Sequence, residues 1–441
     1  MLSFPGTRLP PLRRAPSSDK ASRQFREIMS SPPAPTSSSL AAPRRPLAVV
    51  LVASFWDQSA SEVCPGGRPR LVRDLSRHLS KLGFSVRILQ KGEVDREITL
   101  NHDITVCTVR APIPAWGDLI FALRTRREVR RAQVCFYATP EDGFPFFAPN
   151  GVAIQHGIWW DSPDYSGVWG AVVKGVQLAR ILMMCRRTRR VLCVDVNLAN
   201  CLRQMGALGH AAAAKCTYQP NYVDLAQFPV PSRARIEERW QSQKLLFLRR
   251  FEPPRGALLF IETCRLLRDQ GVTFHAEMVG WGSQFAAVAT LIRKHGLEDH
   301  VKVARLGLDQ VACALDSATI SVVPSRWSEG TSLAAIESIA MGVPVVATDV
   351  GGLPNVVIPH YNGEVVAPRA EALARGVSVL LRDKSLYLDM AANCLAMRPA
   401  FSLSRWTRGI EEVLDSLKLR APFEGTLATP SAEFDGVVQR E

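Results

Sequence analysis

The chain has 441 residues, enough for two or three domains of ordinary size. Apolar residues make up 47% and charged residues 22%, a balance that excludes a wholly disordered chain, a collagen and a coiled coil. No stretch approaches the roughly 18 consecutive apolar residues that would span a bilayer. The sequence therefore predicts a globular chain without a membrane-spanning helix.

The cysteines indicate the compartment of the protein, and the charge limits its possible partners. Ten cysteines are scattered without a Cys-x-x-Cys pair, and we recognise no secretory signal, so we expect free thiols in the cytoplasm and no structural zinc site. The net charge of +13 is unevenly spread: residues 1–46 carry +6, residues 47–235 carry +9 and residues 236–441 carry −2. A nucleic acid, an anionic membrane, a phosphorylated acceptor or simply a solvated basic surface would each account for this excess.

The two ends of the chain lack apolar periodicity. Residues 1–46 hold 9 Pro and 9 Ser and are predicted to form a disordered arm, within which Met29 is an alternative start to Met1. Residues 419–441 are predicted to form a loose tail.

Short apolar runs alternate with amphipathic stretches between these ends. Leu71, Leu75, Leu79 and Leu82 share one helical face, and flanking strands at 47–53 and 85–89 complete a strand–helix–strand unit of parallel-sheet type. Further strands are predicted at 104–109, 133–138, 152–155 and 191–196, and helices at 118–131, 168–188 and 197–205.

A second alternating set begins at Lys244. Its predicted strands are 245–248, 274–279, 301–303, 320–323 and 345–347, and its predicted helices are 258–270, 284–295, 310–316 and 332–341. Two such sets predict two Rossmann-like lobes, at residues 47–235 and 236–400, with the polar segment 232–243 as the crossover between them. A last amphipathic helix is predicted at 401–418.

The segment from Pro324 to Glu337 carries the strongest chemical signal. A strand ends at Pro324, a loop follows, and a helix begins near Ser332, where backbone N–H groups would suit a diphosphate. Two carboxylates flank this helix start: Glu329 lies in the loop and Glu337 lies eight positions later. Carboxylates accept hydrogen bonds from sugar and ribose hydroxyls, and Gly330 lets the backbone approach a ligand closely.

This segment closely resembles the E-x7-E signature of retaining GT-B glycosyltransferases of family 4, and the resemblance continues through residues 338–348 and 351–355. It covers about residues 47–418, more strongly in the second half. It implies a GT-B fold, with two Rossmann-like, doubly wound α/β lobes facing a central cleft. It also implies transfer of a sugar from a nucleotide-sugar to a saccharide or lipid-linked acceptor with retention of configuration, in cell-surface polysaccharide or glycolipid synthesis.

The resemblance assigns roles within this segment. Glu329, Gly330, Thr331 and Glu337 would bind the donor sugar and ribose. The helix start at Ser332 and Leu333 would bind the donor diphosphate. Glu329 would hold sugar hydroxyls rather than attack carbon, because the expected path is a front-face one in which the leaving phosphate helps to deprotonate the acceptor.

A basic segment after the strand 245–248 resembles the family's diphosphate grip. Arg250 and Arg255 stand at the positions of the two cations, and a guanidinium can bind phosphate through two parallel hydrogen bonds. Arg249 stands where the family usually has Gly, so the sequence leaves open whether Arg249 or Arg250 faces the diphosphate.

Three more loops resemble parts of the family's cleft. Gly280 and Gly282 match a Gly-x-Gly turn near the nucleotide. His156 follows a first-lobe strand at a place where the family often has a His facing the donor sugar, and Gly67 belongs to a Gly-Gly loop whose N–H groups could meet phosphate. The turn at Pro220 and Asn221 matches a structural turn before the crossover.

The resemblance implies no metal and no cofactor besides the donor, and no Asp-x-Asp pair stands in a suitable loop. The implied partners are the nucleotide-sugar and the acceptor, and no nucleic acid. Contact with the inner face of an anionic membrane is an open alternative, suggested by the arginines at 186–190 that follow the apolar run 181–184. Two rival functions are a sugar-nucleotide epimerase of the same fold and a non-catalytic nucleic-acid-binding protein.

Overall fold

The computed structural model describes residues 45–57, 59–64, 66–111, 116–138, 143–158, 162–305, 310–327, 329–419 and 438–439. The predicted arm, apart from its last two residues, lies outside the described residues, as do both candidate start residues. So do most of the predicted tail and Ser328. Residues 438–439 form a short strand, β17 (Val438–Gln439).

The first lobe is built on a mostly parallel sheet with the described order β10-β9-β8-β7-β1-β4-β6-β5-β17. Its parallel strands are β1 (Leu47–Val52), β4 (Ser85–Gly92), β6 (Ile104–Arg110), β7 (Val134–Tyr137), β8 (Gly151–Gln155), β9 (Arg190–Cys193) and β10 (Cys216–Tyr218). One edge is antiparallel, because β5 (Arg96–Asn101) runs against β6 and β17 runs against β5. The small strands β2 (Trp56–Asp57) and β3 (Glu62–Val63) pair separately.

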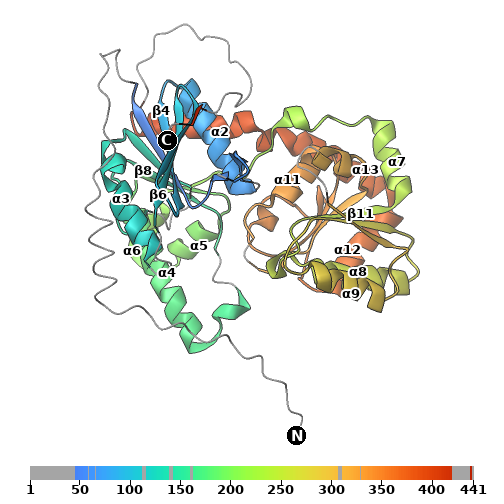
Figure 1. The fold of residues 1–441 in the computed structure, drawn as a ribbon. Helices are drawn as coiled ribbons and strands as arrows, with labels where there is room; N and C mark the ends of the chain where they lie inside the picture. The colour runs from blue at the N-terminus through green and yellow to red at the C-terminus, as the bar shows by residue number, and fades with distance from the viewer. Residues whose placement is uncertain are drawn as a thin grey trace. The chain divides into compact units, whose positions relative to one another are not determined.

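Helices cover both faces of this sheet, and the alternation of side chains along β1 shows how. Ala48, Val50 and Val52 belong to a core cluster with α2 (Gly67–Lys81) and α14 (Leu403–Ser416). Val49 and Leu51 point to the other face. That face is covered by α3 (Gly117–Arg131), α4 (Gly167–Arg187), α5 (Asn197–Arg203) and α6 (Gly206–Ala213), all visible in Figure 1.

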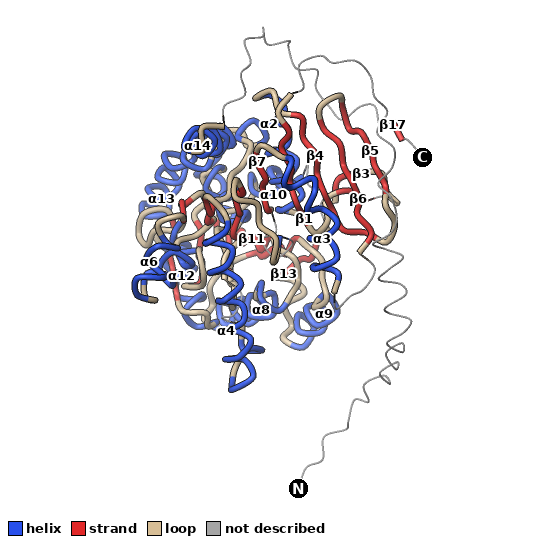
Figure 2. Tube along the Cα trace, turned by 90° about the vertical axis from the view of Figure 1, so that its left-hand side faces the viewer, coloured by secondary structure: helices blue, strands red, loops and turns tan. Residues whose placement is uncertain are grey.

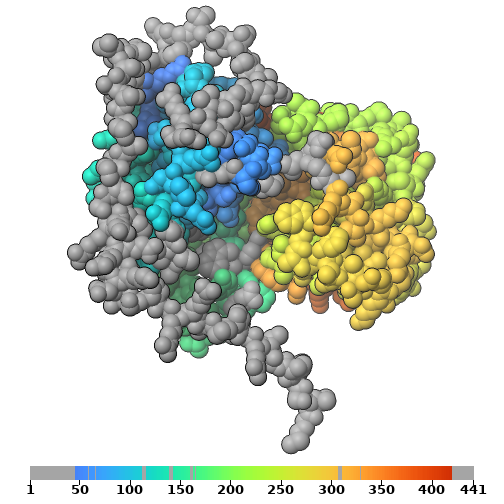
Figure 3. Space-filling model, in the orientation of Figure 1, coloured from blue at the N-terminus to red at the C-terminus, as the bar shows by residue number. Residues whose placement is uncertain are grey.

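The second lobe repeats this plan around a fully parallel sheet with the order β13-β12-β11-β14-β15-β16. Its strands are β11 (Lys244–Leu248), β12 (His275–Val279), β13 (Val301–Ala304), β14 (Ile320–Val323), β15 (Val345–Thr348) and β16 (Gly363–Val366). On one face Leu245 and Phe247 meet α8 (Ala257–Asp269), α9 (Phe285–Lys294) and α12 (Ala370–Arg382). On the other, Leu246 meets α10 (Val311–Asp316), α11 (Leu333–Ala340) and α13 (Lys384–Met397). The space-filling view shows the yellow and orange residues of this lobe packed together (Figure 3).

The connection between the lobes differs from the prediction. Residues 232–243, predicted as the crossover, form helix α7 (Arg233–Ser242), whose Ile236 packs with Tyr387 of α13 in the second lobe. The chain therefore passes between the lobes before α7. It does so beside the start of α14, because the Val223 N–H donates to the Phe401 carbonyl and the Leu403 N–H donates to the Val223 carbonyl, both at 2.9 Å.

Most predicted elements are present, and the differences have physical causes. The predicted helix 197–205 is α5, which ends at Arg203, and a further helix that was not predicted, α6, begins at Gly206, whose φ is +63°. Strand β5 was not predicted, and its pattern of buried residues is that of an edge strand with one exposed face. Neither β16 nor the helices α12 and α13 were predicted, although they complete the second lobe.

Helix α4 passes a test for membrane-spanning helices that the search for an uninterrupted apolar run did not apply. By length and composition it is long and apolar enough to span a membrane, because a window of 18 residues tolerates the two charges of Lys174 and Arg180. Core helices of soluble proteins also pass this test, but they are mostly buried. Only 22% of the window in α4 is buried. Figure 2 shows one end of α4 extending beyond the neighbouring described elements.

Candidate active site

The carboxyl ends of the second-lobe strands bring the predicted site residues together. The sheet order reverses between β11 and β14, because β12 and β13 extend on one side of β11 while β14 and β15 extend on the other. Ligands of open parallel sheets bind in the crevice outside such a switch point. Arg249 follows β11, Gly280 follows β12, and the loop carrying Glu329 follows β14.

Two guanidinium groups converge on Glu329 at this switch point. Arg249 and Arg255 both form ion pairs with Oε2 of Glu329, the second at 2.5 Å. Ser325 links the same groups, since its Oγ accepts a hydrogen bond from Arg249 at 2.5 Å and donates one to Glu329 Oε2 at 2.7 Å. Burial alone would raise the pKa of Glu329, but Arg249, Arg255 and the Ser325 hydroxyl hold it below the ordinary value of a glutamate. Glu329 is therefore an ionised carboxylate.

The structure brings Arg249, and not Arg250, to this carboxylate. The side chain of Arg249 is only 6% exposed, whereas the next residue, Arg250, is exposed. The predicted contact of Arg250 with the diphosphate stays a prediction.

The Gly-x-Gly turn after β12 supports the segment that carries Arg249. The Arg249 N–H donates to the Val279 carbonyl at 3.0 Å, and the Phe251 N–H donates to the Trp281 carbonyl at 2.8 Å. Gly280 has a φ of +154°, and a Cβ there would lie 1.9 Å from the Arg249 carbonyl oxygen. The described contacts of Gly280 therefore position Arg249, and its predicted place beside a nucleotide stays a prediction.

Glu337 lies on α11 and meets the first lobe. Arg70 of α2 donates from Nη1 to Glu337 Oε1 at 3.0 Å, and the Glu337 residue is 9% exposed. Burial raises the pKa of Glu337, and the charge of Arg70 only partly opposes this. The two predicted carboxylates thus stand in different surroundings, with two cations around Glu329 and one beside Glu337.

The loop between the carboxylates is anchored to the first lobe. Thr331 Oγ1 donates to the Val194 carbonyl at 3.0 Å and accepts from the Asn221 N–H at 3.1 Å. The Asn221 side chain also donates to the Thr331 carbonyl. The hydroxyl of Thr331, predicted to bind the donor, is therefore engaged in holding this loop against the first lobe.

Gly67 and Leu333 meet although 266 positions separate them in the chain. A Cβ on Gly67 would lie 2.9 Å from Leu333 Cδ1, so the glycine lets α2 lie against the start of α11 without a shift of the Leu333 side chain. Ser332 precedes α11, is 3% exposed, and makes no side-chain capping hydrogen bond. The structure thus brings three residues predicted to bind the diphosphate into one place.

His156 faces the same region from the first lobe. Its Nε2 lies 2.9 Å from the Ala138 carbonyl oxygen, which can only accept, so Nε2 carries the proton. Burial, together with the nearby Arg68, lowers the pKa of His156 to about 4. A Cβ on Gly330 would lie 3.2 Å from the His156 carbonyl oxygen, so this loop touches the loop of Glu329. Residues 159–161 of the predicted motif lie outside the described residues.

Sequence reasoning missed three residues of this site. Arg70 was not singled out, although it lies three positions after Gly67 on the predicted first helix. From the sequence, Ser325 is only part of a loop, and Asn221 is only part of a structural turn. The contacts of Arg70 and Asn221 join segments from both lobes, and those of Ser325 lie within the second lobe. Within the described ranges, no group of three or more His, Cys, Asp or Glu gathers in a way that could hold a metal ion.

Two doubly wound lobes, with a switch-point site in the second, are the features of the GT-B class. HepE from Anabaena, solved in complex with UDP and glucose, superposes with a TM-score of 0.64 at 17% identity, covering 84% of this chain and 99% of that one. Sucrose-phosphate synthase from Thermosynechococcus elongatus superposes with a TM-score of 0.69 at 20% identity, covering 85% of this chain and 99% of that one. The predicted GT-B fold is confirmed.

The sequence comparisons show the family. Residues 232–395 match the model of the glycosyl transferases group 1 family. Glycogen synthase of Mycobacterium tuberculosis is 30% identical over 350 residues, which cover 76% of this chain and 81% of that protein. The chain therefore belongs to the glycosyl transferases group 1 family.

Other curated relatives are matched over less of their length. The amylovoran biosynthesis glycosyltransferase AmsK of Erwinia amylovora is 31% identical over 164 residues, 36% of this chain and 40% of that protein. The chain spans between 34% and 48% of the length of AmsK and three further relatives.

Proposed function

We propose that this protein transfers a sugar from a nucleotide-sugar to a saccharide or lipid-linked acceptor, with retention of the anomeric configuration. The observation that carries the proposal is the convergence of Arg249 and Arg255 on one carboxylate, Glu329, at the switch point of the second lobe. Two guanidinium groups at such a crevice suit a diphosphate. HepE, which shares the fold, was solved with UDP and glucose.

In this proposal Arg249 and Arg255 bind the donor diphosphate. The sequence left open whether Arg249 or Arg250 faces the diphosphate, and we propose Arg249. Both cations pair with Glu329, so an arriving diphosphate competes with that carboxylate for them. Glu329 is then free to accept hydrogen bonds from the hydroxyls of the transferred sugar, a few ångströms from the diphosphate. This exchange keeps the two guanidinium groups paired before and after donor binding.

Glu337 would accept hydrogen bonds from the ribose, and the N–H groups at the start of α11 would face the diphosphate. Only Oε1 of Glu337 takes part in the contact with Arg70, so the carboxylate retains acceptor capacity. The approach of Gly67 to Leu333 places the first-lobe loop beside the same helix start.

The transfer step breaks the bond between the anomeric carbon and the phosphate oxygen. The acceptor oxygen bonds to that carbon on the same face, and its proton passes to the departing phosphate. Arg249, Arg255 and the start of α11 would stabilise the negative charge that grows on the leaving group. These groups belong to the chain itself, so the proposal requires no metal and no cofactor.

His156 would lie across the cleft from the donor sugar. Since its Nε2 proton is held by the Ala138 carbonyl, Nδ1 is left as an acceptor for a hydroxyl, and the low pKa keeps the ring neutral. His156 is therefore proposed as a group that orients the sugar, with no change of its own charge during transfer.

We also propose a place for this reaction in polysaccharide or glycolipid synthesis at the inner face of the membrane, within the cytoplasm. AmsK, a relative by sequence, is named for the biosynthesis of the polysaccharide amylovoran. The free state of all ten cysteines fits a reducing compartment.

Contact with an anionic membrane is proposed for helix α4. The predicted run 181–184 is half-buried or buried, so it cannot supply the apolar contact. The exposed apolar side chains stand at the other end of α4, where Val168 is 86% and Trp169 77% exposed. Val172 and Val176 continue this face at helical spacing, and a Trp at its end suits the lipid headgroup region.

Thermal-shift measurements with a panel of nucleotide-sugars would identify the donor, and turnover would test the reaction. We expect release of nucleoside diphosphate only when a saccharide acceptor is also present, and a product whose anomeric configuration is that of the donor by NMR. Nucleotide release without acceptor would favour the epimerase alternative, and an inverted product would refute retention.

A further inference from the structure

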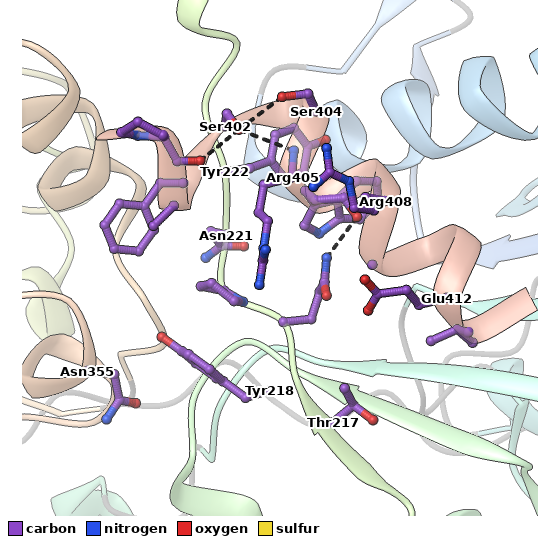
Figure 4. Close-up of a pocket in the computed structure, with 18 of the residues that line it drawn as sticks. Thr217, Tyr218, Asn221, Tyr222, Asn355, Ser402, Ser404, Arg405, Arg408 and Glu412 are labelled. Atoms are coloured by element: carbon purple, nitrogen blue, oxygen red, sulfur yellow. Dashed lines mark hydrogen bonds between the residues drawn. The ribbon is translucent and has the colours of Figure 1, made fainter. Parts of the chain in front are cut away.

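A cavity lies beside the linker that connects the two lobes. It has a volume of about 1060 Å³ and is enclosed by the edge strand β10, the linker 219–222, the turn at Asn355 and helix α14. Figure 4 shows side chains from α14 and from the linker segment facing each other across it.

This cavity, which we call the hinge pocket, is distinct from the proposed donor site. None of Arg249, Arg255, Glu329, Glu337 or Gly67 is among its lining residues. Asn221 connects the two sites, because it lines the hinge pocket and also holds the Thr331 loop through two hydrogen bonds. A ligand of the hinge pocket would therefore bind without occupying the donor cations.

The charged side chains of the hinge pocket favour an anion. Arg190, Arg405 and Arg408 line it, and Glu412 is its single carboxylate. Throughout the described part of the chain, no carboxylate or carbonyl is found to pair with any of these three guanidinium groups. Glu412 can neutralise one at most, so the pocket presents excess positive charge in the fork geometry that suits phosphate.

The volume of the hinge pocket and its uncharged lining residues favour a ligand larger than a free phosphate ion. Pockets of several hundred Å³ hold whole small molecules. Tyr218 lines the wall and is 42% exposed, so its ring offers a face on which a sugar ring can lie. Ser404, Thr217 and the carboxamide of Asn355 add polar groups that match hydroxyls.

We propose that the hinge pocket binds a phosphorylated saccharide through Arg405, Arg408 and Arg190, separately from the nucleotide-sugar. The proposal does not depend on the reaction assigned to the donor site, because it uses none of that site's residues. The shared chemistry is a phosphate monoester, and a sugar phosphate is distinguished from free phosphate by the additional contact with Tyr218.

The test is calorimetric titration of the full chain with glucose 1-phosphate, inorganic phosphate and glucose. We expect glucose 1-phosphate to bind more tightly than inorganic phosphate, and glucose not to bind. The double variant R405A/R408A should weaken binding of glucose 1-phosphate by at least about tenfold, because two charge-assisted contacts are lost. Glu412→Gln should tighten it, because the competing carboxylate is neutralised.

Two controls separate this site from other sources of anion binding. Arg382→Ala removes an exposed arginine at the end of α12, outside the pocket, and should leave the affinity unchanged. Arg249→Ala removes a donor-site cation and should also leave it unchanged. If Arg249→Ala abolishes binding while R405A/R408A retains it, the anion occupies the donor site and the proposal is wrong. Equal affinity for inorganic phosphate and glucose 1-phosphate would refute the saccharide part, as would the absence of any binding.

Discussion

Arg70 of the first lobe and Glu337 of the second are joined by a hydrogen bond of 3.0 Å between Nη1 and Oε1. Glu337 is buried, so its charge depends on this partner more than an exposed carboxylate would. Because Glu337 is also the proposed ribose acceptor, one carboxylate takes part in the contact between the lobes and in donor binding. Glu329 has no such contact with an arginine of the first lobe in the described structure.

The two carboxylates should therefore respond differently to removal. We expect Glu337→Ala to weaken binding of the donor's nucleoside diphosphate by at least about tenfold, since a charge-assisted hydrogen bond contributes about 1.5–3 kcal/mol. Glu329→Ala should not weaken this binding, because it frees Arg249 and Arg255 from a competing carboxylate. It should nevertheless lower kcat, because contacts to the transferred sugar are lost.

Calorimetry with the nucleoside diphosphate and turnover with the full donor measure these two effects separately. Loss of nucleotide binding in Glu329→Ala with normal binding in Glu337→Ala would mean that the two roles are reversed. Unchanged binding and turnover in both variants would mean that the motif is structural.

Arg249 and Arg250 offer a matched pair of variants. Arg249→Ala should weaken binding of the nucleoside diphosphate by about tenfold or more, because a buried guanidinium at the switch point is removed. Arg250→Ala removes the same charge from an exposed position on the neighbouring residue and should leave the affinity close to that of the wild type. A larger effect of Arg250→Ala, in protein of unchanged thermal stability, would restore the original assignment.

Metal dependence is a separate prediction of the proposed charge arrangement. If Arg249, Arg255 and the start of α11 meet the diphosphate charge, EDTA should leave the rate of transfer essentially unchanged. Assays with and without added Mg²⁺ or Mn²⁺ complete the measurement. Loss of activity in EDTA that either ion restores would contradict the model.

His156 should make stability depend on pH. Its folded-state pKa of about 4 lies below the ordinary value of 6.5, so protonation favours the unfolded chain. The stabilisation is complete above pH 6.5 and is lost as the pH falls from there towards about 4, by up to about 3 kcal/mol. Denaturant unfolding of the wild type and of His156→Asn across this range should show a smaller loss in the variant. Parallel pH profiles would show that the ring is solvated.

The α4 surface should bind acidic vesicles through both charge and apolar contact. Binding of the wild type to vesicles with anionic lipid should weaken as salt is raised towards about 1 M, where the screening length is about 3 Å. Trp169→Ser with Val172→Ser should reduce binding at low salt, whereas Val379→Ser, at an exposed valine of α12, should not. Equal binding to neutral vesicles would exclude the electrostatic part of the proposal.

The sequence determined the local elements and the type of chemistry. Apolar runs with helical stretches between them identified both parallel sheets, because a strand buried on two faces must be apolar throughout. The string from Pro324 to Glu337 identified the helix start and its two carboxylates. Helices α12 and α13 were not predicted from the sequence, although α12 contributes to the core of the second lobe.

Only the tertiary structure decided which side chains face one another. Whether Arg249 or Arg250 reaches Glu329 depends on the course of the backbone after β11. The turn at Gly280, which follows β12, contacts the backbone of Arg249 and so helps to set that course. The pairing of Arg70 with Glu337, and of Asn221 with Thr331, joins residues more than one hundred positions apart. Residue types and spacing describe neighbours along the chain, whereas these contacts arise because two separately folded lobes bring distant loops to the carboxyl ends of their sheets.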